Sequence, residues 1–294
     1  MRIGFVGLGR MGGALARRLM REHHLCVFDL RPEVLQAFAA EGAEAMQSAA
    51  ALAEKCDLVL TCLPTSAEVR DVIFGAEGLA AHMKKGSLIA DMTTGDPNAT
   101  RQMADALAVK GIDLIDAPVS GGPHGAAAGT IAIIVGATDS QFERVRQVFA
   151  TISPNVFHTG GVGTGQIMKL VNNVIAAGVR AATFEAVALG VKNGLDLKTC
   201  VDILAKGTAR SYTTELALPG LLDPNRKMTF SLGLMHKDVR LATDVASQSG
   251  VPMPVASAVR EVFQTAINEL GYETDLNDLI KVCERQARVE IVPV

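Results

Sequence analysis

The chain has 294 residues, of which 49% are hydrophobic and 20% are charged, so it can bury a large core and disorder is not expected. This length exceeds one ordinary hydrophobic core and predicts two domains. The formal net charge of −3 supplies neither a basic footprint for nucleic acid nor a polybasic face for an anionic membrane, which argues against both kinds of partner.

The cysteines argue against a disulfide framework. They are odd in number and form no CxxC pair, so a structural zinc site is not expected either, and we predict no metal site. We interpret them as small buried side chains in a reducing compartment. The five are Cys26, Cys56, Cys62, Cys200 and Cys283. Because the N-terminus does not resemble a secretion signal and we expect no membrane-spanning segment, we predict a cytoplasmic protein.

The first 160 residues alternate short apolar runs with stretches of helical spacing. Continuous apolar strands between amphipathic helices indicate βαβ units, a parallel sheet covered on both faces and hence a doubly wound, Rossmann-type α/β fold. Helical spacing is clear at Met11–Met20 and Glu33–Ala40. The predicted strands are Ile3–Val6, Leu25–Phe28, Leu58–Cys62, Leu88–Asp91, Ile112–Asp116 and Ile131–Val135.

The pattern changes after Phe157. The glycine-rich segment 159–165 is interpreted as a hinge without strand character, and 166–193 as one long helix that is apolar almost all round. Further helices are predicted at Lys198–Lys206, Leu232–Ser249, Pro254–Leu270 and Leu276–Val289. We therefore expect a dinucleotide-binding Rossmann domain over residues 1–162 and an all-α domain for substrate binding and oligomerisation over residues 163–294, joined by the long interdomain helix.

The strongest local signal is the GxGxxG pattern of Gly7, Gly9 and Gly12, which follows an apolar strand and opens a helix. In such a loop the first glycine permits a tight turn, the second lets the backbone approach a diphosphate and the third allows close packing of helix on sheet. The N–H groups at the helix N-terminus then favour the anion. This pattern predicts a dinucleotide site.

An acidic residue, Asp29, ends the second predicted strand about 20 residues after the glycine motif. A carboxylate at this point accepts hydrogen bonds from the adenosine ribose and repels a 2′-phosphate, which favours NAD over NADP. Arg31 lies two residues further on; it is either a phosphate partner, which keeps NADP possible, or a solvated surface charge.

Three more loops follow predicted strands, where ligands of open α/β sheets bind. Leu63-Pro64 and the loop holding Thr94 are either cofactor contacts or simple caps and turns. Ser120-Gly121-Gly122 offers a hydroxyl and backbone N–H groups suited to a carboxylate, although a glycine turn with a capping serine is the alternative.

On the long helix, Lys169 and Asn173 are four residues apart and share one face. A lysine at this point of an apolar helix either extends to water or has a partner, and in a cleft its amine is suited to proton transfer. The segment 236–238, His-Lys-Asp, taken alone reads as solvated helix surface.

Taken together, four segments in this order resemble the β-hydroxyacid dehydrogenase family: residues 7–12, 116–122, 163–173 and 236–238. The resemblance covers essentially the whole chain and implies Lys169 as catalytic general acid and base. It implies substrate contacts from Ser120, Gly121, Gly122 and Asn173. It implies cofactor contacts from Gly7, Leu8, Gly9, Arg10, Met11, Gly12, Asp29, Leu30, Arg31, Leu63, Pro64, Thr94 and Lys237.

The function implied is NAD-dependent, reversible hydride transfer between the nicotinamide and a small β-hydroxy acid or its semialdehyde. The pair Asp29-Leu30, where NADP-dependent members tend to carry Asn-Arg, supports NAD. The family also implies a homodimer or homotetramer. The alternatives are a tartronate semialdehyde reductase specifically, which the tail 284–291 resembles, and a non-catalytic NAD-binding sensor. Residues 207–212 look more like 2-hydroxymethylglutarate enzymes, so the substrate stays open.

Overall fold

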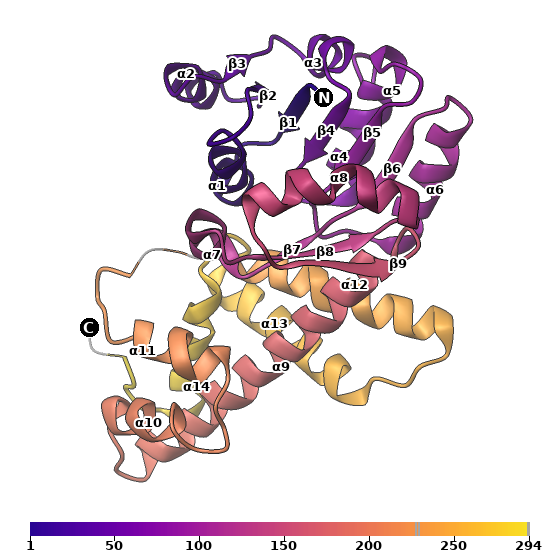
Figure 1. Ribbon diagram of the computed structural model, residues 1–294. Helices are drawn as coiled ribbons and strands as arrows, with labels where there is room; N and C mark the ends of the chain where they lie inside the picture. The colour runs from indigo at the N-terminus through magenta and orange to yellow at the C-terminus, as the bar shows by residue number, and fades with distance from the viewer. Residues whose placement is uncertain (227, 229, 293–294) are drawn as a thin grey trace. The chain divides into compact units, whose positions relative to one another are not determined.

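The computed structural model describes residues 1–226, 228 and 230–292. The chain divides into two compact units, Met1–Lys169 and Leu170–Val294. The first is an α/β unit and the second is helical (Figure 1), which confirms the predicted fold class. The predicted functional boundary between residues 162 and 163 stays a prediction.

A single twisted sheet forms the centre of the first unit. Its strand order is β3-β2-β1-β4-β5-β6-β8-β7, with β9 paired to β8. The six strands from β3 to β6 in this order are parallel, and the order reverses direction beside β1, the arrangement of a doubly wound fold. The strands are β1 (Ile3–Val6), β2 (Leu25–Phe28), β3 (Glu44–Ala45), β4 (Leu58–Thr61), β5 (Leu88–Asp91), β6 (Asp113–Asp116), β7 (Val119–Ser120), β8 (Ala132–Gly136) and β9 (Val156–Gly160).

Helices cover both faces of this sheet. One apolar cluster joins the strands to α1, α2, α7 and α8, and a second joins them to α3, α4, α5 and α6. Because side chains alternate along a strand, Phe5 belongs to the first cluster and its neighbour Val6 to the second. The helices are α1 (Arg10–Leu19), α2 (Pro32–Ala40), α3 (Ala49–Lys55), α4 (Ser66–Phe74), α5 (Leu79–His82), α6 (Pro97–Ala108), α7 (Gly122–Ala128) and α8 (Asp139–Ile152).

Two details of the sheet differ from the sequence prediction. The run around Ile131–Val135 does form a strand, but β8 pairs antiparallel with β6 and β7, so the sheet is not wholly parallel. The segment 159–165, predicted to lack strand character, contributes Thr159 and Gly160 to β9 before the chain turns into a helix. An apolar run carries no information about strand direction, and a short strand at the end of the sheet needs no apolar pattern.

Helices with their own apolar core form the second unit. Large buried side chains meet there from three helices, Phe184 of α9, Val239 of α12 and Phe263 of α13. The long predicted helix is α9 (Thr164–Lys192), whose first turns belong to the first unit. The others are α10 (Leu197–Leu204), a π-helical turn (Thr213–Ala217), α11 (Leu218–Gly220), α12 (Leu232–Ser249), α13 (Pro254–Leu270), a 3₁₀ turn (Leu276–Asp278) and α14 (Leu279–Ala287).

The helix α9 corrects one expectation about membranes. Among the described residues it is the helix long and apolar enough to cross a bilayer, with a mean hydropathy of 1.6 in its most apolar window. No such segment is expected from the sequence, because no stretch of 18 apolar residues is seen in it. The buried helix of a globular core passes the same test of length and composition, so this finding is weak evidence for a membrane span.

Candidate active site

The glycine loop between β1 and α1 has the shape that a diphosphate needs. A Cβ on Gly7 would lie 2.4 Å from the carbonyl oxygen of Cys62, and one on Gly12 would lie 2.0 Å from that of Gly7, so neither position admits a side chain. A Cβ on Gly9 would meet nothing within 4 Å, and Gly9 gives α1 no side-chain cap. The loop therefore presents open space beside uncapped N–H groups, which fits the diphosphate of a dinucleotide.

At the end of β2, Asp29 is held by hydrogen bonds on both oxygens. The backbone N–H of Leu8 donates to Oδ2 at 2.7 Å, and Arg31 donates from Nε to Oδ1 and from Nη2 to Oδ2, both at 2.9 Å. The guanidinium of Arg31 is thus paired with Asp29 rather than being an unattached surface charge. The neighbouring Leu30 is 89% exposed.

The loops after β4 and β5 are joined to each other by a buried polar network. The hydroxyl of Thr61 donates to Asp91 Oδ1 at 2.8 Å, and the N–H of Leu63 donates to the Thr93 hydroxyl at 2.9 Å. Burial raises the pKa of Asp91 to about 6, against the opposing effect of its hydrogen bonds. This network places the predicted Leu63-Pro64 and Thr94 loops at the same edge of the sheet.

The Ser120 loop has a backbone that only glycine adopts easily. Ser120 ends β7, and Gly121 and Gly122 follow with φ angles of 132° and 70°. Positive φ at two successive positions strains any residue with a Cβ. The glycines of the predicted carboxylate loop are therefore required by the turn itself, whatever they bind.

The beginning of α9 is held by Asp116 at the end of β6. Its two oxygens accept the backbone N–H groups of Gly163 at 2.6 Å and Gln166 at 2.7 Å. Burial raises the pKa of Asp116 to about 6, and these two hydrogen bonds oppose the shift. Lys169, the last residue of the first unit, lies in the next turn of the helix and is 9% exposed.

In the second unit, the predicted Asn173 and Lys237 meet at one carboxylate. The Asn173 side-chain amide donates to Asp238 Oδ2 at 2.6 Å, and Lys237 Nζ lies 3.1 Å from Asp238 Oδ1. All three side chains are nearly buried. The His-Lys-Asp segment is therefore not a solvated face, and Asp238 orients both predicted residues.

Sequence reasoning overlooked the side chains that hold these loops, namely Asp91, Asp116 and Gln166. Asp91 and Asp116 end predicted strands, a position that could have flagged them, because an acid at the carboxyl end of a buried strand has few ways to be solvated. Nothing in the sequence singles out Gln166, whose partners lie 71 and 73 residues away along the chain.

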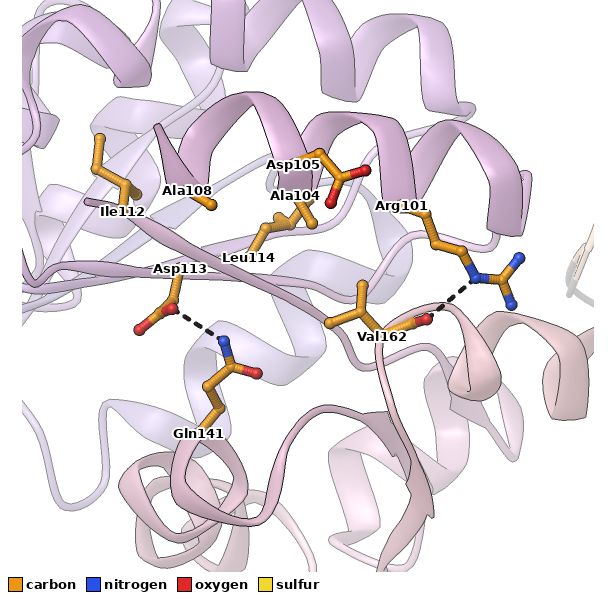
Figure 2. A pocket seen from close by; sticks show the side chains of 9 residues that line it. All are labelled: Arg101, Ala104, Asp105, Ala108, Ile112, Asp113, Leu114, Gln141 and Val162. Carbon is orange, nitrogen blue, oxygen red and sulfur yellow. Dashed lines mark hydrogen bonds between the residues drawn. The ribbon is translucent and has the colours of Figure 1, made fainter. Parts of the chain in front are cut away.

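A shallow pocket of about 290 Å³ on the first unit lies apart from the predicted site residues. Figure 2 shows its wall of α6 side chains, including Arg101, whose Nε donates to the carbonyl of Val162, and the bond between Gln141 and Asp113. None of the predicted site residues lines it, so we assign it no part in the chemistry.

Two family models match the chain. The model described as the NAD binding domain of 6-phosphogluconate dehydrogenase matches residues 2–160, and the one described as NAD-binding of NADP-dependent 3-hydroxyisobutyrate dehydrogenase matches residues 163–283. The two matches together extend over both units.

Similar proteins and structures carry consistent names. A 2-(hydroxymethyl)glutarate dehydrogenase of Eubacterium barkeri is 36% identical, covering 99% of this chain and 97% of its own. A 3-hydroxyisobutyrate dehydrogenase of Pseudomonas aeruginosa is 36% identical over 89% of this chain and 90% of its own length. A crystal structure of 3-hydroxyisobutyrate dehydrogenase from Salmonella typhimurium is 29% identical, with a TM-score of 0.88 and coverage of 96% and 99%.

Proposed function

Because this chain belongs to the β-hydroxyacid dehydrogenase family, we propose that it transfers hydride reversibly between NAD and a small β-hydroxy acid or its semialdehyde, with Lys169 as general acid and base. The observation that carries the proposal is the open space at Gly9 beside the uncapped start of α1, in a chain that also has a nearly buried lysine at the start of α9.

The cofactor is proposed to bind along the glycine loop from Gly7 to Gly12, with the ribose of its adenosine at Asp29. The carboxylate of Asp29 favours NAD because it would repel a 2′-phosphate. The remaining contacts proposed are those of Leu8, Arg10, Met11, Leu30, Arg31, Leu63, Pro64, Thr94 and Lys237. When bound, the nicotinamide accepts the hydride in oxidation and returns it in reduction.

The substrate is proposed to bind by its carboxylate to the Ser120 hydroxyl and the backbone N–H groups of Gly121 and Gly122. Asn173 is proposed to orient the substrate hydroxyl through its side-chain amide, which Asp238 holds at 2.6 Å. Because the amide nitrogen is turned toward Asp238, the amide oxygen, which accepts a hydrogen bond from Asn172 Nδ2 at 2.9 Å, offers its second lone pair to the substrate hydroxyl.

Lys169 is proposed to carry the proton. In oxidation the neutral amine takes the proton of the substrate hydroxyl group while the hydride leaves the carbon atom that bears this hydroxyl. In reduction the ammonium form returns that proton to the oxygen. General acid–base catalysis of this kind contributes about 10²–10⁴-fold, and positioning of the reactants contributes more.

The names of two relatives suggest the substrate class. 3-Hydroxyisobutyrate and 2-(hydroxymethyl)glutarate each carry a carboxylate and a hydroxyl on the β carbon. We propose a substrate with that same pair of groups. Tartronate semialdehyde carries an aldehyde on the β carbon, and its reduction produces a β-hydroxyl, so it is the specific alternative on the semialdehyde side.

We further propose that the protein is cytoplasmic and forms a homodimer or homotetramer through the second unit. Supporting this, α9 exposes apolar side chains, among them Ile175 at 61% and Leu189 at 67%. Sedimentation of the purified chain measures the assembly, and a monomer at every concentration contradicts it.

The test of the function is a panel of hydroxy acids offered with NAD and with NADP, with turnover followed by nicotinamide absorbance. The β-hydroxy acids in the panel are 3-hydroxyisobutyrate, 2-(hydroxymethyl)glutarate, D-glycerate, L-serine and L-threonate, and 4-hydroxybutyrate is included as a γ-hydroxy acid. We expect turnover with at least one β-hydroxy acid, and faster turnover with NAD. Tight NAD binding with no turnover on any member would favour the non-catalytic sensor instead.

A further inference from the structure

The side chain of Gln166 joins the loop after β5 to the first turn of α9. Its amide nitrogen donates to the carbonyl oxygen of Thr93 at 2.8 Å, and its amide oxygen accepts the N–H of Gly95 at 2.9 Å. These two bonds bracket Thr94, the residue proposed to lie near the nicotinamide. Gln166 is fully buried, so water does not compete for either bond.

The backbone of Gln166 is held from a different strand. Its N–H donates to Asp116 Oδ2, while Asp116 Oδ1 accepts the N–H of Gly163. A carboxylate at a helix N-terminus satisfies N–H groups that the helix leaves unpaired and is favoured by the helix dipole. Asp116 therefore holds the first turn of α9 to the end of β6.

Two glycines, Gly136 and Gly165, pack so closely against the Asp116 carboxylate that a side chain at either position would collide with it. A Cβ on Gly136 would lie 2.5 Å from Asp116 Oδ1, and a Cβ on Gly165 would lie 2.8 Å from Asp116 Oδ2. A Cβ on Gly165 would also lie 2.5 Å from the carbonyl oxygen of Ile134. The carboxylate therefore has little freedom to move, and the position of the helix start is closely defined.

We propose that Gln166, held by Asp116, is a positioning residue for proton transfer: it sets Lys169 relative to the loop that contains Thr94. Gln166 precedes Lys169 by three residues, a rise of roughly 4.5 Å along the helix. Because the two Gln166 hydrogen bonds hold this turn of α9 to the Thr93–Gly95 loop, they also fix the distance between Lys169 and that loop. This inference rests on the proposed role of Lys169.

The physical reason to expect a large effect is the steep dependence of rate on geometry. A misplacement of about 1 Å can cost on the order of 10²-fold in rate even when the altered residue is not in contact with the reacting atoms. Loss of the two Gln166 bonds frees the loop and the helix to move apart by that amount without opening the fold.

The experiment compares Gln166→Met with a matched control, Gln141→Met. Gln141 is also in the first unit, and its side-chain amide likewise accepts one hydrogen bond and donates one: its oxygen accepts the N–H of Thr138 at 3.0 Å, and its nitrogen donates to the Asp113 carboxylate at 2.9 Å (Figure 2). Both substitutions remove one donor and one acceptor and keep an unbranched side chain. The measurements are kcat, KM, the Kd for NAD, the melting temperature and the solvent deuterium isotope effect on kcat.

For Gln166→Met we expect kcat to fall about 10²-fold, with KM and the Kd for NAD changed less than about threefold. The solvent isotope effect on kcat should rise, because proton transfer becomes slower relative to the other steps. Gln141→Met should keep its kcat and isotope effect, whatever thermal stability it loses. Equal changes in kcat for the two variants, or an unchanged isotope effect in Gln166→Met, would overturn the proposal.

A second variant covers the case in which Gln166→Met does not fold. Gln166→Asn keeps the amide and its neutral charge but is one methylene shorter, so it cannot reach both Thr93 and Gly95, and its kcat should lie between those of the wild type and Gln166→Met. A wild-type kcat in Gln166→Asn would contradict the proposal. The two proposals can fail separately. Turnover by the wild type and its loss in Lys169→Ala support the proposed function. If the Gln166 variants then behave like Gln141→Met, only the positioning role of Gln166 is wrong.

Discussion

Arg31 donates two hydrogen bonds to the Asp29 carboxylate, from Nε to Oδ1 and from Nη2 to Oδ2, each at 2.9 Å. Burial by itself would raise the pKa of Asp29, but the hydrogen bonds from Arg31 and from the Leu8 N–H outweigh it and lower the pKa below the ordinary value for aspartate. The group is a carboxylate at neutral pH. It therefore keeps the negative charge that disfavours a 2′-phosphate and at the same time occupies the arginine that could bind one.

Replacing this acid should change the cofactor preference. In Asp29→Ser the carboxylate is gone and Arg31 is released. We expect the ratio of kcat/KM for NADP to that for NAD to rise about 10–100-fold, as charge-assisted hydrogen bonds are worth about 1.5–3 kcal/mol. Steady-state rates with both cofactors measure the ratio.

The matched control is Glu41→Ser. Glu41 accepts two bonds from Arg17, both at 2.7 Å, and so forms the same kind of arginine–carboxylate pair in the same unit, but at a surface to which we assign no cofactor contact. In Glu41→Ser the ratio of kcat/KM for NADP to kcat/KM for NAD should equal that of the wild type. An unchanged preference in Asp29→Ser would show that Asp29 does not select the cofactor.

Two alanine substitutions in the glycine loop should separate binding from folding. Gly12→Ala forces a Cβ to 2.0 Å from the Gly7 carbonyl oxygen, so we expect a lower melting temperature. Gly9→Ala meets no protein atom within 4 Å and should keep its melting temperature, while the Kd for NAD rises at least about tenfold because the methyl group occupies the diphosphate position. Gly161→Ala, also with open space, is the control for both measurements. Wild-type NAD affinity in Gly9→Ala would mean that the diphosphate lies elsewhere.

The buried carboxyl of Asp91 predicts a pH dependence of stability. Its pKa is raised from 3.8 to about 6 in the folded chain, so between these values the folded state binds more protons than the unfolded state. Its contribution to stability is therefore fully present below pH 3.8 and is lost as the pH rises through about 6.

Asp91→Asn removes this titration while keeping the size of the side chain. We expect its free energy of unfolding, relative to the wild type, to increase between pH 4 and pH 6 by on the order of 2–3 kcal/mol and then to stay level. Urea unfolding across this range measures the difference, and Asp116 titrates in both proteins. A difference independent of pH would contradict the raised pKa of Asp91.

Arg180 on α9 is a buried charge in an unusual position. It is 6% exposed, and within the described part of the chain its Nε has no hydrogen-bond partner. Burial lowers its pKa to about 10, against the attraction of Tyr212 and Asp275. A buried charge of this kind costs more in desolvation than it regains, so Arg180→Met should raise the free energy of unfolding by about 1–3 kcal/mol.

The comparison variant is Arg226→Met, which breaks an ion pair with Asp278 at 2.6 Å and should lower the free energy of unfolding. Denaturant titration at neutral pH measures both. A loss of stability in Arg180→Met as large as that in Arg226→Met would show that Arg180 has a stabilising partner in the folded protein.

Local patterns in the sequence were enough to predict the dinucleotide loop, the two fold classes and the helices α12 and α13 with their bounds. Each of these depends on neighbours in the chain: glycine spacing, strand-length apolar runs, and helical periodicity ended by Gly250 or Gly271. For Lys169 and Ser120 the local sequence leaves a structural and a functional interpretation open, and the family resemblance favours the functional one.

What escaped prediction depends on contacts between distant segments. The carboxylate of Asp116 finds its two donors 47 and 50 residues away, and the direction of β8 is set by its pairing with β6 and β7. Neither leaves a periodic trace in the sequence. The same holds for Asp238, which reads as a surface residue until Asn173 is placed beside it.

One measurement decides whether this chain is the enzyme described here: the turnover of Lys169→Ala at saturating NAD and hydroxy acid, alongside its Kd for NAD. We predict a loss of at least about 10²-fold in kcat with an almost unchanged Kd, and an equal loss in Lys169→Arg, since a guanidinium does not release its proton near neutral pH. Wild-type turnover in either variant would contradict it.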